Sequence, residues 1–159
     1  MSLKDVARQS RGDWEQLYRR AFPDVYRAVV AVVFDADIAL DSVQDAFEIG
    51  LRNPPKVEAN LTGWLFRVAV RRALRVRLRR PPRQMPSAYT SELDRTLDRI
   101  ETRRLLELLT PRQRSIVVAH YFLGLHHEEI ASLLGIRRGT VGATISHALA
   151  RMREENSHA

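Results

Sequence analysis

The chain of 159 residues contains no cysteine. Disulfide bonds and thiolate metal sites are therefore excluded, and the absence fits a protein of the cytoplasm. There is no run of about 18 consecutive apolar residues, the length that a membrane-spanning helix needs. The first ten residues, MSLKDVARQS, lack the apolar segment of a secretion signal. We therefore expect a cytoplasmic protein with no membrane insertion.

Acidic side chains are missing from one internal segment. Residues 59–91 contain eight arginines and no Asp or Glu, a net charge of +8, whereas residues 1–58 carry −2 and residues 92–159 carry +1. The excess positive charge of the chain thus lies in this segment. Such a cluster indicates a polyanionic partner, most simply nucleic acid. The alternative is a solvated arginine-rich helix, because 24 of the 26 basic residues are arginine.

Apolar residues recur at helical spacing through most of the chain, and no segment predicts a strand. We expect Pro23 to break or restart the first helical stretch. Asp35 is the expected N-cap of the next helix, in which Ile38, Val43, Phe47, Ile49 and Leu51 form the apolar face. A further helix is predicted from about Gly63 to Arg80.

Three prolines interrupt the helical pattern in residues 81–92, PPRQMPSAYTSE. We interpret this stretch as a linker. Beyond it, Thr110 at N-cap, Pro111 at N1 and Gln113 at N3 predict the start of a helix. The predicted fold is all-α, with two small helical domains, residues 1–80 and 93–159, joined by the short Pro-rich linker 81–92.

The second domain contains a helix-turn-helix pattern between residues 128 and 152. Ile130, Leu133 and Leu134 are expected on the inward face of its first helix, which Gly135 ends through a positive φ. The second helix is predicted from about Gly139 to Arg153. Its apolar stripe is Val141, Ile145, Leu149 and Met152, which leaves Arg138, Gly142, Ala143, Ser146 and His147 facing outward and Thr144 at the edge. In a helix-turn-helix this second helix enters the DNA major groove.

The run His126-His127-Glu128-Glu129 invites comparison with a metal site. A zinc-protease pattern needs a second histidine four residues after the first, and Ile130 and Ala131 occupy those positions. The glutamates suit the first turn of a helix instead. Since the chain also has no glycine-rich phosphate loop and no nucleophile elbow, we expect no metal, no cofactor and no enzymatic activity.

Two separate blocks resemble one family. Residues 109–153, LTPRQRSIVVAHYFLGLHHEEIASLLGIRRGTVGATISHALARMR, resemble the promoter-recognition domain of bacterial RNA polymerase sigma factors. SVQDAF (42–47) and GWLFRVAVRRAL (63–74) resemble the sigma segment that binds polymerase and opens promoter DNA. Their order and short linker are similar to the extracytoplasmic-function (ECF) group. The alternatives are a stand-alone helix-turn-helix regulator and a degenerate sigma-like protein with weak promoter binding.

The resemblance implies three interfaces and a set of partners: RNA polymerase core, promoter DNA and an anti-sigma factor. The clamp helices of the largest polymerase subunit would meet Asp41, Gln44, Asp45 and Glu48. The minus-ten element would meet Trp64, Arg67, Arg71, Arg72 and Arg75, with residues 56–62 as a base-capture loop and Trp64 alternatively in the core. The minus-thirty-five element would meet Arg137, Arg138, Thr140, Ala143, Thr144, Ser146, His147 and Arg151.

The chain departs from the family pattern at several of these positions. The family commonly has lysine, serine and arginine after Thr140-Val141, where this chain has Gly142, Ala143 and Thr144. Small residues at these positions either let the helix approach the bases more closely or weaken the minus-thirty-five contact. Arg137 stands where a serine N-cap is common, and Arg71 where asparagine is common.

Overall fold

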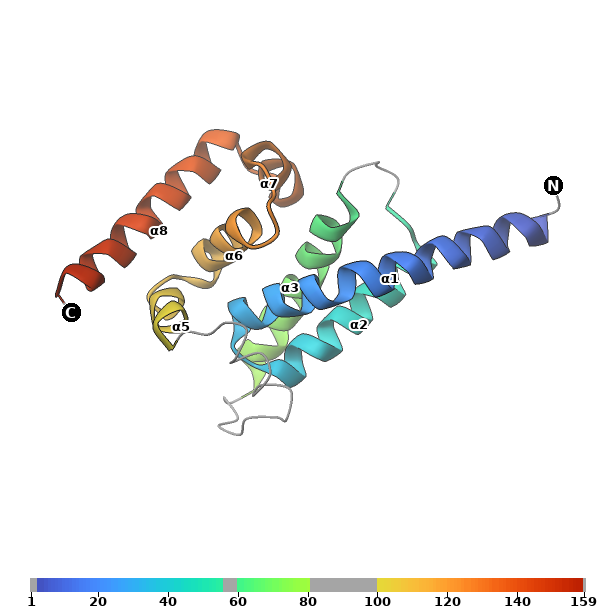
Figure 1. The fold of residues 1–159 in the computed structure, drawn as a ribbon, viewed down its shortest axis with the longest axis horizontal. Helices are drawn as coiled ribbons and strands as arrows, with labels where there is room; N and C mark the ends of the chain where they lie inside the picture. The colour runs from blue at the N-terminus through green and yellow to red at the C-terminus, as the bar shows by residue number, and fades with distance from the viewer. Residues whose placement is uncertain (1–2, 56–59, 81–99, 159) are drawn as a thin grey trace.

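The computed structural model describes residues 3–55, 60–80 and 100–158, and the regular elements in these ranges are all α-helices (Figure 1). The predicted all-α class is thereby confirmed. The helices are α1 (Leu3–Val33), α2 (Ala36–Arg52), α3 (Leu61–Arg79), α5 (Ile100–Glu107), α6 (Pro111–Tyr121), α7 (His127–Leu134) and α8 (Arg138–His158). The expected linker, residues 81–92, lies outside the described residues. No described helix combines the length and apolar character needed to cross a membrane.

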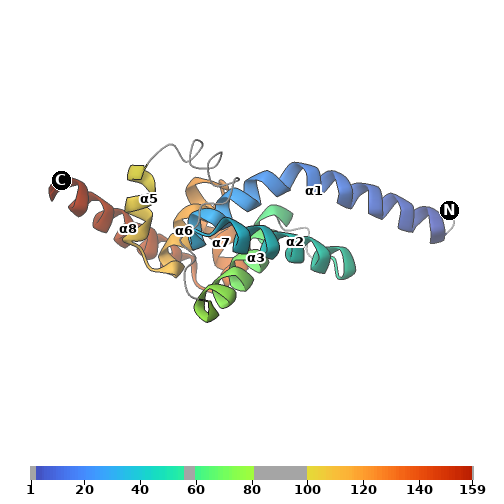
Figure 2. The same ribbon diagram turned by 90° about the horizontal axis from the view of Figure 1, so that it is seen from below.

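Helices α1, α2 and α3 pack together as one group, and α5 to α8 form a second group (Figures 1 and 2). The core of the first group is built on valines and on Leu65, with Val25, Val29, Val43 and Leu65 fully buried. These side chains come from all three helices at helical spacing, so each helix turns one apolar stripe inward.

Pro23 does not end the first helix, and the expected break there is wrong. Helix α1 runs from Leu3 to Val33 with Pro23 inside it, on the exposed surface. A proline inside a helix costs about 3 kcal/mol. Full burial of a valine contributes about 1.5–3 kcal/mol, so the burial of Val25, Val29 and Val32 outweighs that cost.

The turn between α1 and α2 follows the prediction at Asp35. Its Oδ1 accepts a hydrogen bond from the backbone N–H of Ile38 at 3.0 Å, which makes Asp35 the N-cap of α2. The expected apolar face of α2 is correct for Ile38, Val43 and Phe47, which are buried. It is wrong for Ile49 and Leu51, which are 37% and 51% exposed.

Gly50 explains why the buried stripe of α2 ends differently from the prediction. It follows Phe47 by three residues and lies in the core, where a Cβ would come within 2.4 Å of the Trp14 ring and 3.0 Å of the Trp64 ring. The two indole rings therefore occupy the space beside the helix. Ile49 and Leu51 flank Gly50 on other sides of the helix and remain at the surface.

Helix α3 begins two residues earlier than expected, at Leu61. Asn60 is its N-cap, because the Asn60 side chain accepts a hydrogen bond from the backbone N–H of Gly63 at 3.1 Å. Leu61 and Thr62 thus belong to the helix and not to the expected loop, and residues 56–59 of that loop lie outside the described residues. Trp64 is partly buried against the core.

The predicted helix start at Thr110 and the predicted glycine turn at Gly135 are confirmed, and Gly124 makes a second glycine turn. Thr110 and Gln113 form a reciprocal capping box at the start of α6. Gly124 has φ +70° and Gly135 has φ +64°, and each follows the end of a helix. The inward assignment is wrong for Leu134, which is 39% exposed, and Tyr121 of α6 is 60% exposed. Ile130, one turn before Leu134, is fully buried and carries the inward face of α7.

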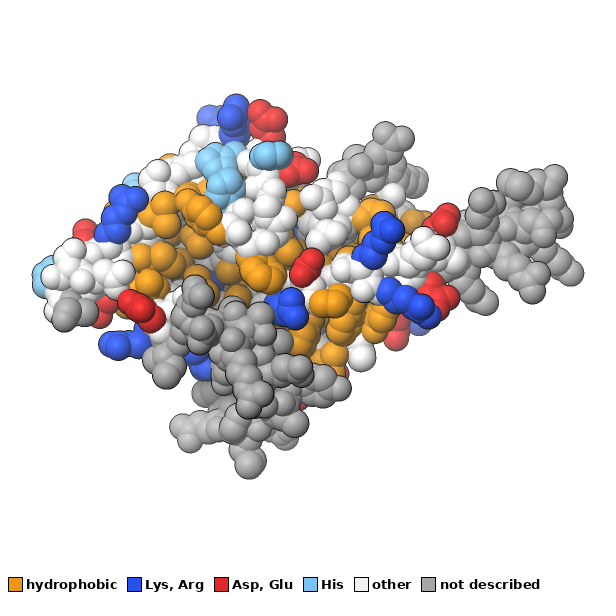
Figure 3. Space-filling model, in the orientation of Figure 1, with side chains coloured by type: hydrophobic (Ala, Val, Ile, Leu, Met, Phe, Trp, Pro, Cys, Tyr) orange, Lys and Arg blue, Asp and Glu red, His pale blue; other side chains and the backbone are white. Residues whose placement is uncertain are grey.

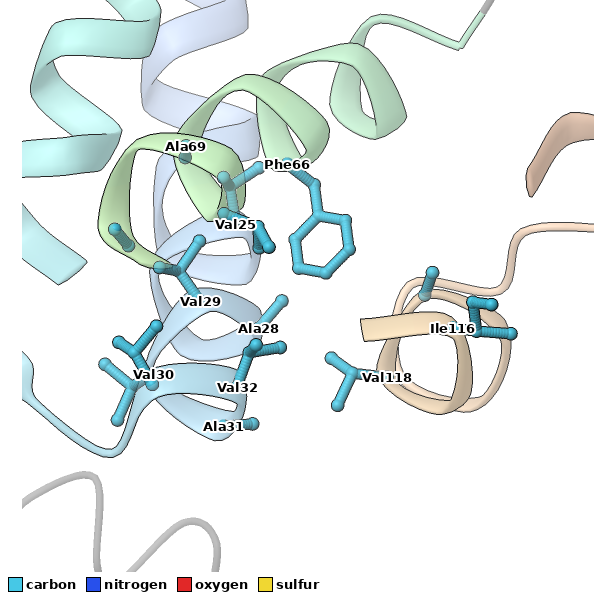
Figure 4. Packing of buried hydrophobic residues seen from close by; sticks show 14 of the residues in the cluster. Val25, Ala28, Val29, Val30, Ala31, Val32, Phe66, Ala69, Ile116 and Val118 are labelled. Carbon is cyan, nitrogen blue, oxygen red and sulfur yellow. The ribbon is translucent and has the colours of Figure 1, made fainter. Parts of the chain in front are cut away.

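The two helix groups meet through buried side chains, so their apolar cores are continuous. In Figure 4, Val118 of α6 points toward Val32 and Ala28 of α1, and Phe66 of α3 lies beside the same space. All four are buried. The two groups are therefore packed against each other, although each has its own inward-facing stripes.

Candidate nucleic-acid interface

The arginines of helix α3 fall into two sets: some are exposed to solvent, and others are hydrogen-bonded to carbonyls elsewhere in the chain. Arg71, Arg72 and Arg75 are exposed, as are Arg79 and Arg80, while Leu65, Phe66, Ala69, Val70 and Ala73 occupy the buried side. The arginine-rich stretch is thus mainly a surface, not a buried segment. Arg71 and Arg75 make no ion pair with any described residue, so their charges are free for a polyanion.

Arg67 is predicted to contact DNA, but it faces the second helix group. Its Nη1 donates a hydrogen bond to the carbonyl of Leu133, the next-to-last residue of α7, at 3.2 Å. Its Nε is buried and has no hydrogen-bond partner among the described residues. Of the five predicted minus-ten residues, the structure therefore presents Arg71, Arg72 and Arg75 on an open surface and holds Arg67 and Trp64 partly buried.

Arg77 belongs to the same arginine cluster but has a structural partner. Its Nη1 donates to the carbonyl of Val33 at 2.8 Å and lies 4.0 Å from the Asp35 carboxylate. A cation at the C-terminal end of α1 satisfies a free carbonyl and complements the helix dipole. Sequence reasoning could not have found this role, because Arg77 and its acceptor are 44 residues apart.

The residues predicted to meet polymerase lie on one side of α2. Asp41, Gln44 and Glu48 are exposed and Asp45 is half-buried. Asp45 Oδ2 lies 2.5 Å from Arg72 Nε, and Glu48 lies 3.8 Å from Arg52. The acidic side of α2 therefore adjoins the arginine side of α3, and one ion pair links them.

The outer side of α8 carries mostly short side chains, together with a histidine and an arginine. Thr140, Ala143, Ser146, His147 and Arg151 are exposed, while Val141, Ile145 and Ala148 are buried. This arrangement agrees with the predicted division of the helix for those residues. The steps between Thr140, Ala143, His147 and Arg151 place these four on one side of the helix.

Gly142 does not face outward as expected. It is half-buried, and a Cβ at this position would lie 3.7 Å from Nδ1 of His127 in α7. The expectation that it belongs to the outer face is wrong, because the α7–α8 turn brings the His127 ring against it. Thr144 is also half-buried, and its hydroxyl donates to the carbonyl of Thr140 at 2.7 Å.

Charged residues surround the turn between α7 and α8. Arg138 Nη1 lies 3.2 Å from Oε1 of Glu128, and both side chains are largely exposed. The carbonyl of Arg137 accepts the backbone N–H groups of Thr140 and Val141, so its backbone occupies the N-cap position of α8. Figure 3 shows basic and acidic side chains together at this turn, beside histidine side chains. At the start of α7, Glu129 accepts a hydrogen bond from the backbone N–H of His126 at 2.8 Å.

Within the described residues, no group of three His, Cys, Asp or Glu side chains lies close enough together to hold a metal ion.

A cavity of about 600 Å³ lies between α3 on one side and α6 and α7 on the other. Phe66, Val70, Ile130 and Leu133 contribute to its apolar wall. Arg67, Arg71 and Arg112 also line it, and none of the lining side chains in the described part of the chain is a carboxylate. Arg71 therefore borders both this cavity and the exposed arginine surface of α3.

Comparison with known proteins matches both helix groups to one family. Residues 17–82 match the model described as Sigma-70 region 2, and residues 99–152 match Sigma-70, region 4. The RNA polymerase sigma-E factor of Streptomyces avermitilis is 40% identical over 76 residues, which cover 47% of this chain and 42% of the relative. The ECF RNA polymerase sigma factor SigM of Mycobacterium tuberculosis is 30% identical over 148 residues, which cover 87% of this chain and 74% of SigM.

Two solved structures share the fold. The sigma factor RpoE in complex with the anti-sigma factor NepR from Bartonella quintana has a TM-score of 0.70 at 22% identity, covering 89% of this chain and 95% of RpoE. CnrH in complex with the cytosolic domain of CnrY has a TM-score of 0.72 at 20% identity, covering 96% of this chain and 95% of the matched chain. Both sigma regions are matched in order, and the match to SigM covers 74% of its length. The chain therefore belongs to the extracytoplasmic-function sigma factors of bacterial RNA polymerase.

Proposed function

We propose that this chain directs RNA polymerase core to a specific set of promoters and initiates transcription there. It would act in the cytoplasm as a binding subunit and catalyse no reaction of its own. The observation that carries the proposal is the pairing, on one chain, of an exposed arginine surface on α3 with an exposed helix-turn-helix surface on α8. A stand-alone regulator would need only the second surface.

Residues 1–80 form the proposed domain for polymerase binding and promoter opening. Extruding a base from the duplex costs on the order of a few kcal/mol. Exposed cations that follow the phosphates help to offset this cost, as does capture of the separated bases. We assign the phosphate role to Arg71, Arg72 and Arg75. Arg67 would join them once its hydrogen bond to the Leu133 carbonyl is broken. Base capture is proposed for residues 56–60, which precede α3, and Trp64 would support that role from its partly buried position.

Polymerase docking is assigned to the acidic side of α2. Asp41, Gln44 and Glu48 are exposed, and with Asp45 they offer carboxylate and amide groups to a basic partner. The proposed partner surface is the clamp helices of the largest polymerase subunit. This docking would place the arginine side of α3 next to the DNA that polymerase holds.

Residues 93–159 form the proposed duplex-reading domain, joined to the first by the linker 81–92. The proposed base-edge readers are Thr140, Ala143, Ser146 and His147, because they lie on the outer side of α8. Thr144 would add a methyl contact at the edge. Arg137, Arg138 and Arg151 would contact phosphates at the two ends of this surface.

We further propose that an anti-sigma factor regulates the chain. The two fold relatives are both described in complex with a second protein, and one of those partners is named as an anti-sigma factor. A partner that covers the arginine surface of α3 or the outer side of α8 would block promoter binding.

The test is transcription in vitro with the core polymerase of the source bacterium and a randomised promoter library. We expect the purified chain to bind core and to yield transcripts that share two elements, which correspond to minus ten and minus thirty-five. The matched comparison is the triple variant Arg71→Ala, Arg72→Ala, Arg75→Ala, which should bind core and lose open-complex formation. Specific footprints by the chain alone on two-fold symmetric sites, without core binding, would favour the stand-alone regulator and contradict the proposal.

A further inference from the structure

The cavity between α3 and the pair α6 and α7 is large enough for a small organic molecule. Its volume is about 600 Å³, and ligand pockets in proteins commonly measure about 300–1,000 Å³. Much of its wall is apolar: Phe66 and Val70 of α3, Ala119 of α6 and Ile130 of α7 all line it, and all four are buried. A cavity of this size and lining suits a molecule with an apolar body.

Three arginines without acidic partners line the same cavity. Arg67 and Arg71 come from α3 and Arg112 from α6. Arg67 and Arg71 are four residues apart, so they lie on one side of α3. None of the three forms an ion pair with a described residue, and the described wall of the cavity contains no acidic side chain. The positive charge here is therefore available to an anion from outside the chain.

The guanidinium of Arg67 has a buried donor that lacks an acceptor. Its Nη1 donates to the Leu133 carbonyl at 3.2 Å, but its Nε is buried and has no hydrogen-bond partner among the described residues. A buried charged donor without an acceptor is unfavourable, and a ligand that supplies the acceptor removes this cost. Because Arg67 lines the cavity, an anionic oxygen bound there would be such an acceptor.

The first turn of α6 adds a further donor beside the arginines. The Thr110 N–H donates to the Gln113 side chain, the Gln113 N–H donates to the Thr110 hydroxyl, and Pro111 has no N–H. This leaves the Arg112 N–H as the donor of this turn with no partner in the described part of the chain. Thr110, Pro111 and Arg112 all line the cavity. The positive end of the α6 dipole therefore also favours an anion there.

From this combination we infer that the cavity is a binding site for a small amphiphilic anion, a carboxylate on an acyl chain, as in a fatty acid. The acyl chain would lie along the apolar wall, and the carboxylate would accept hydrogen bonds from Arg67, Arg71 and Arg112. A carboxylate suits these donors because it carries a single charge and accepts a guanidinium in a bidentate manner. A phosphate monoester carries close to two charges and would lose more hydration beside the buried Nε.

A ligand in this cavity would also compete with nucleic acid for Arg71. This arginine is exposed and borders both the cavity and the arginine surface of α3. A guanidinium that is paired with a carboxylate is less available to a phosphate, so the chain should bind single-stranded DNA less tightly when the cavity is filled. This consequence rests on the proposed function, because Arg71 is one of the proposed phosphate contacts. Binding of the anion itself does not rest on it.

Calorimetric titration of the full chain with decanoate, below its micelle concentration, tests the site. We expect saturable binding of one decanoate per chain. Decanol has the same carbon chain without the charge and should bind much more weakly. Octanoate should bind roughly tenfold more weakly than decanoate, since each buried methylene tightens binding about fourfold. Equal binding of decanoate and decanol, or tighter binding of decyl phosphate than of decanoate, would overturn the inference.

Two substitutions alter the cavity without removing a proposed DNA contact. Arg112→Ala removes a cation, and Arg104→Ala is its matched control, because Arg104 is exposed in α5 and lies outside the cavity. Ser115→Leu fills part of the cavity, and Ser132→Leu changes an exposed serine of α7 outside it. We expect Arg112→Ala to weaken decanoate binding about two- to fivefold and Ser115→Leu to weaken it further, with both controls unchanged. If circular dichroism shows that the variants are folded and they bind decanoate as their controls do, the site is assigned wrongly.

The buried donor of Arg67 provides a spectroscopic readout of the same contact. Arginine Nε–H groups give their own signals in a proton–nitrogen correlation spectrum, and the Arg67 signal is the one that Arg67→Lys removes. We expect decanoate, and not decanol, to shift this signal downfield, because the donor gains an anionic acceptor. An Arg67 signal that stays in place under saturating decanoate would contradict the proposed contact.

Fluorescence anisotropy with labelled single-stranded DNA tests the competition at Arg71. Relative to the same concentration of sodium chloride, saturating decanoate should raise the Kd of the chain for DNA about two- to fivefold and should leave the Kd of Arg71→Ala unchanged. An equal effect on both chains would exclude competition at Arg71. If neither chain binds DNA, the proposed function is contradicted, while the decanoate titrations still decide whether the anion site exists.

Discussion

Asp45 and Arg72 form an ion pair that joins α2 to α3, with 2.5 Å between Oδ2 and Nε. Asp45 belongs to the proposed polymerase interface and Arg72 to the proposed DNA interface. Each of these groups must exchange its partner when the chain engages both polymerase and promoter. Because the pair is about half exposed, it contributes only about 0.2–1 kcal/mol, which a polymerase or phosphate contact can replace.

Neutralising Asp45 should affect both interfaces. Asp45→Asn removes one acidic docking group and frees Arg72, so we expect core affinity to fall by up to about fivefold and affinity for single-stranded DNA to rise. Asp41→Asn is the matched control, since Asp41 is exposed and has no ion pair within the described residues. It should lower core affinity alone. Fluorescence anisotropy with labelled core and labelled DNA measures both, and unchanged DNA affinity of Asp45→Asn would contradict the shared role.

Arg71 should contribute to the salt dependence of promoter binding. Each phosphate contact contributes about 0.7–0.9 to the slope of log K against log salt concentration. We therefore expect Arg71→Ala in the holoenzyme to make this slope shallower by about that amount. Arg104→Ala removes an exposed arginine of α5 that is not in the proposed interfaces, and it should leave the slope unchanged. Equal slopes for the two variants would remove Arg71 from the phosphate contacts.

An arginine introduced on α8 should strengthen DNA binding more at position 143 than at position 142. Ala143 is exposed, whereas Gly142 faces the His127 ring. Ala143→Arg is expected to strengthen holoenzyme binding to duplex promoter DNA and to steepen the salt slope by about 0.9. Gly142→Arg should gain less, because its side chain must first pass His127. Band-shift titrations across several salt concentrations measure this, and equal gains would show that residue 142 also faces the groove.

The glycine of the helix-turn-helix turn should be required for stability. Gly135 has φ +64°, and an L-residue in this conformation costs roughly 1–2 kcal/mol. Gly135→Ala should lower the free energy of unfolding by about 1 kcal/mol. Gly139→Ala is the control, because Gly139 lies in the first turn of α8 with open space around it. It should raise stability by up to about 1 kcal/mol, and urea unfolding followed by circular dichroism would show opposite changes. A neutral Gly135→Ala would contradict the argument from φ.

The features that the sequence determined depend on neighbours within a few residues. Asp35 caps α2 through the N–H three residues later, and Thr110 and Gln113 cap α6 across the same spacing. Gly135 ends α7 with its own backbone conformation. The stripe of Val141 and Ile145 follows from helical periodicity. Because these interactions close within one helical turn, the residues alone specify them.

Only the tertiary structure separated the roles of the arginines, which look alike in the sequence. Arg67 bonds to a carbonyl 66 residues away, Arg77 to one 44 residues away and Arg114 to one 82 residues away. The continuation of α1 through Pro23 and the inward position of Gly142 also depend on helices that pack from elsewhere in the chain. A guanidinium donates hydrogen bonds to any carbonyl, carboxylate or phosphate within reach, so its partner is set by which helices meet and not by its neighbours in the chain.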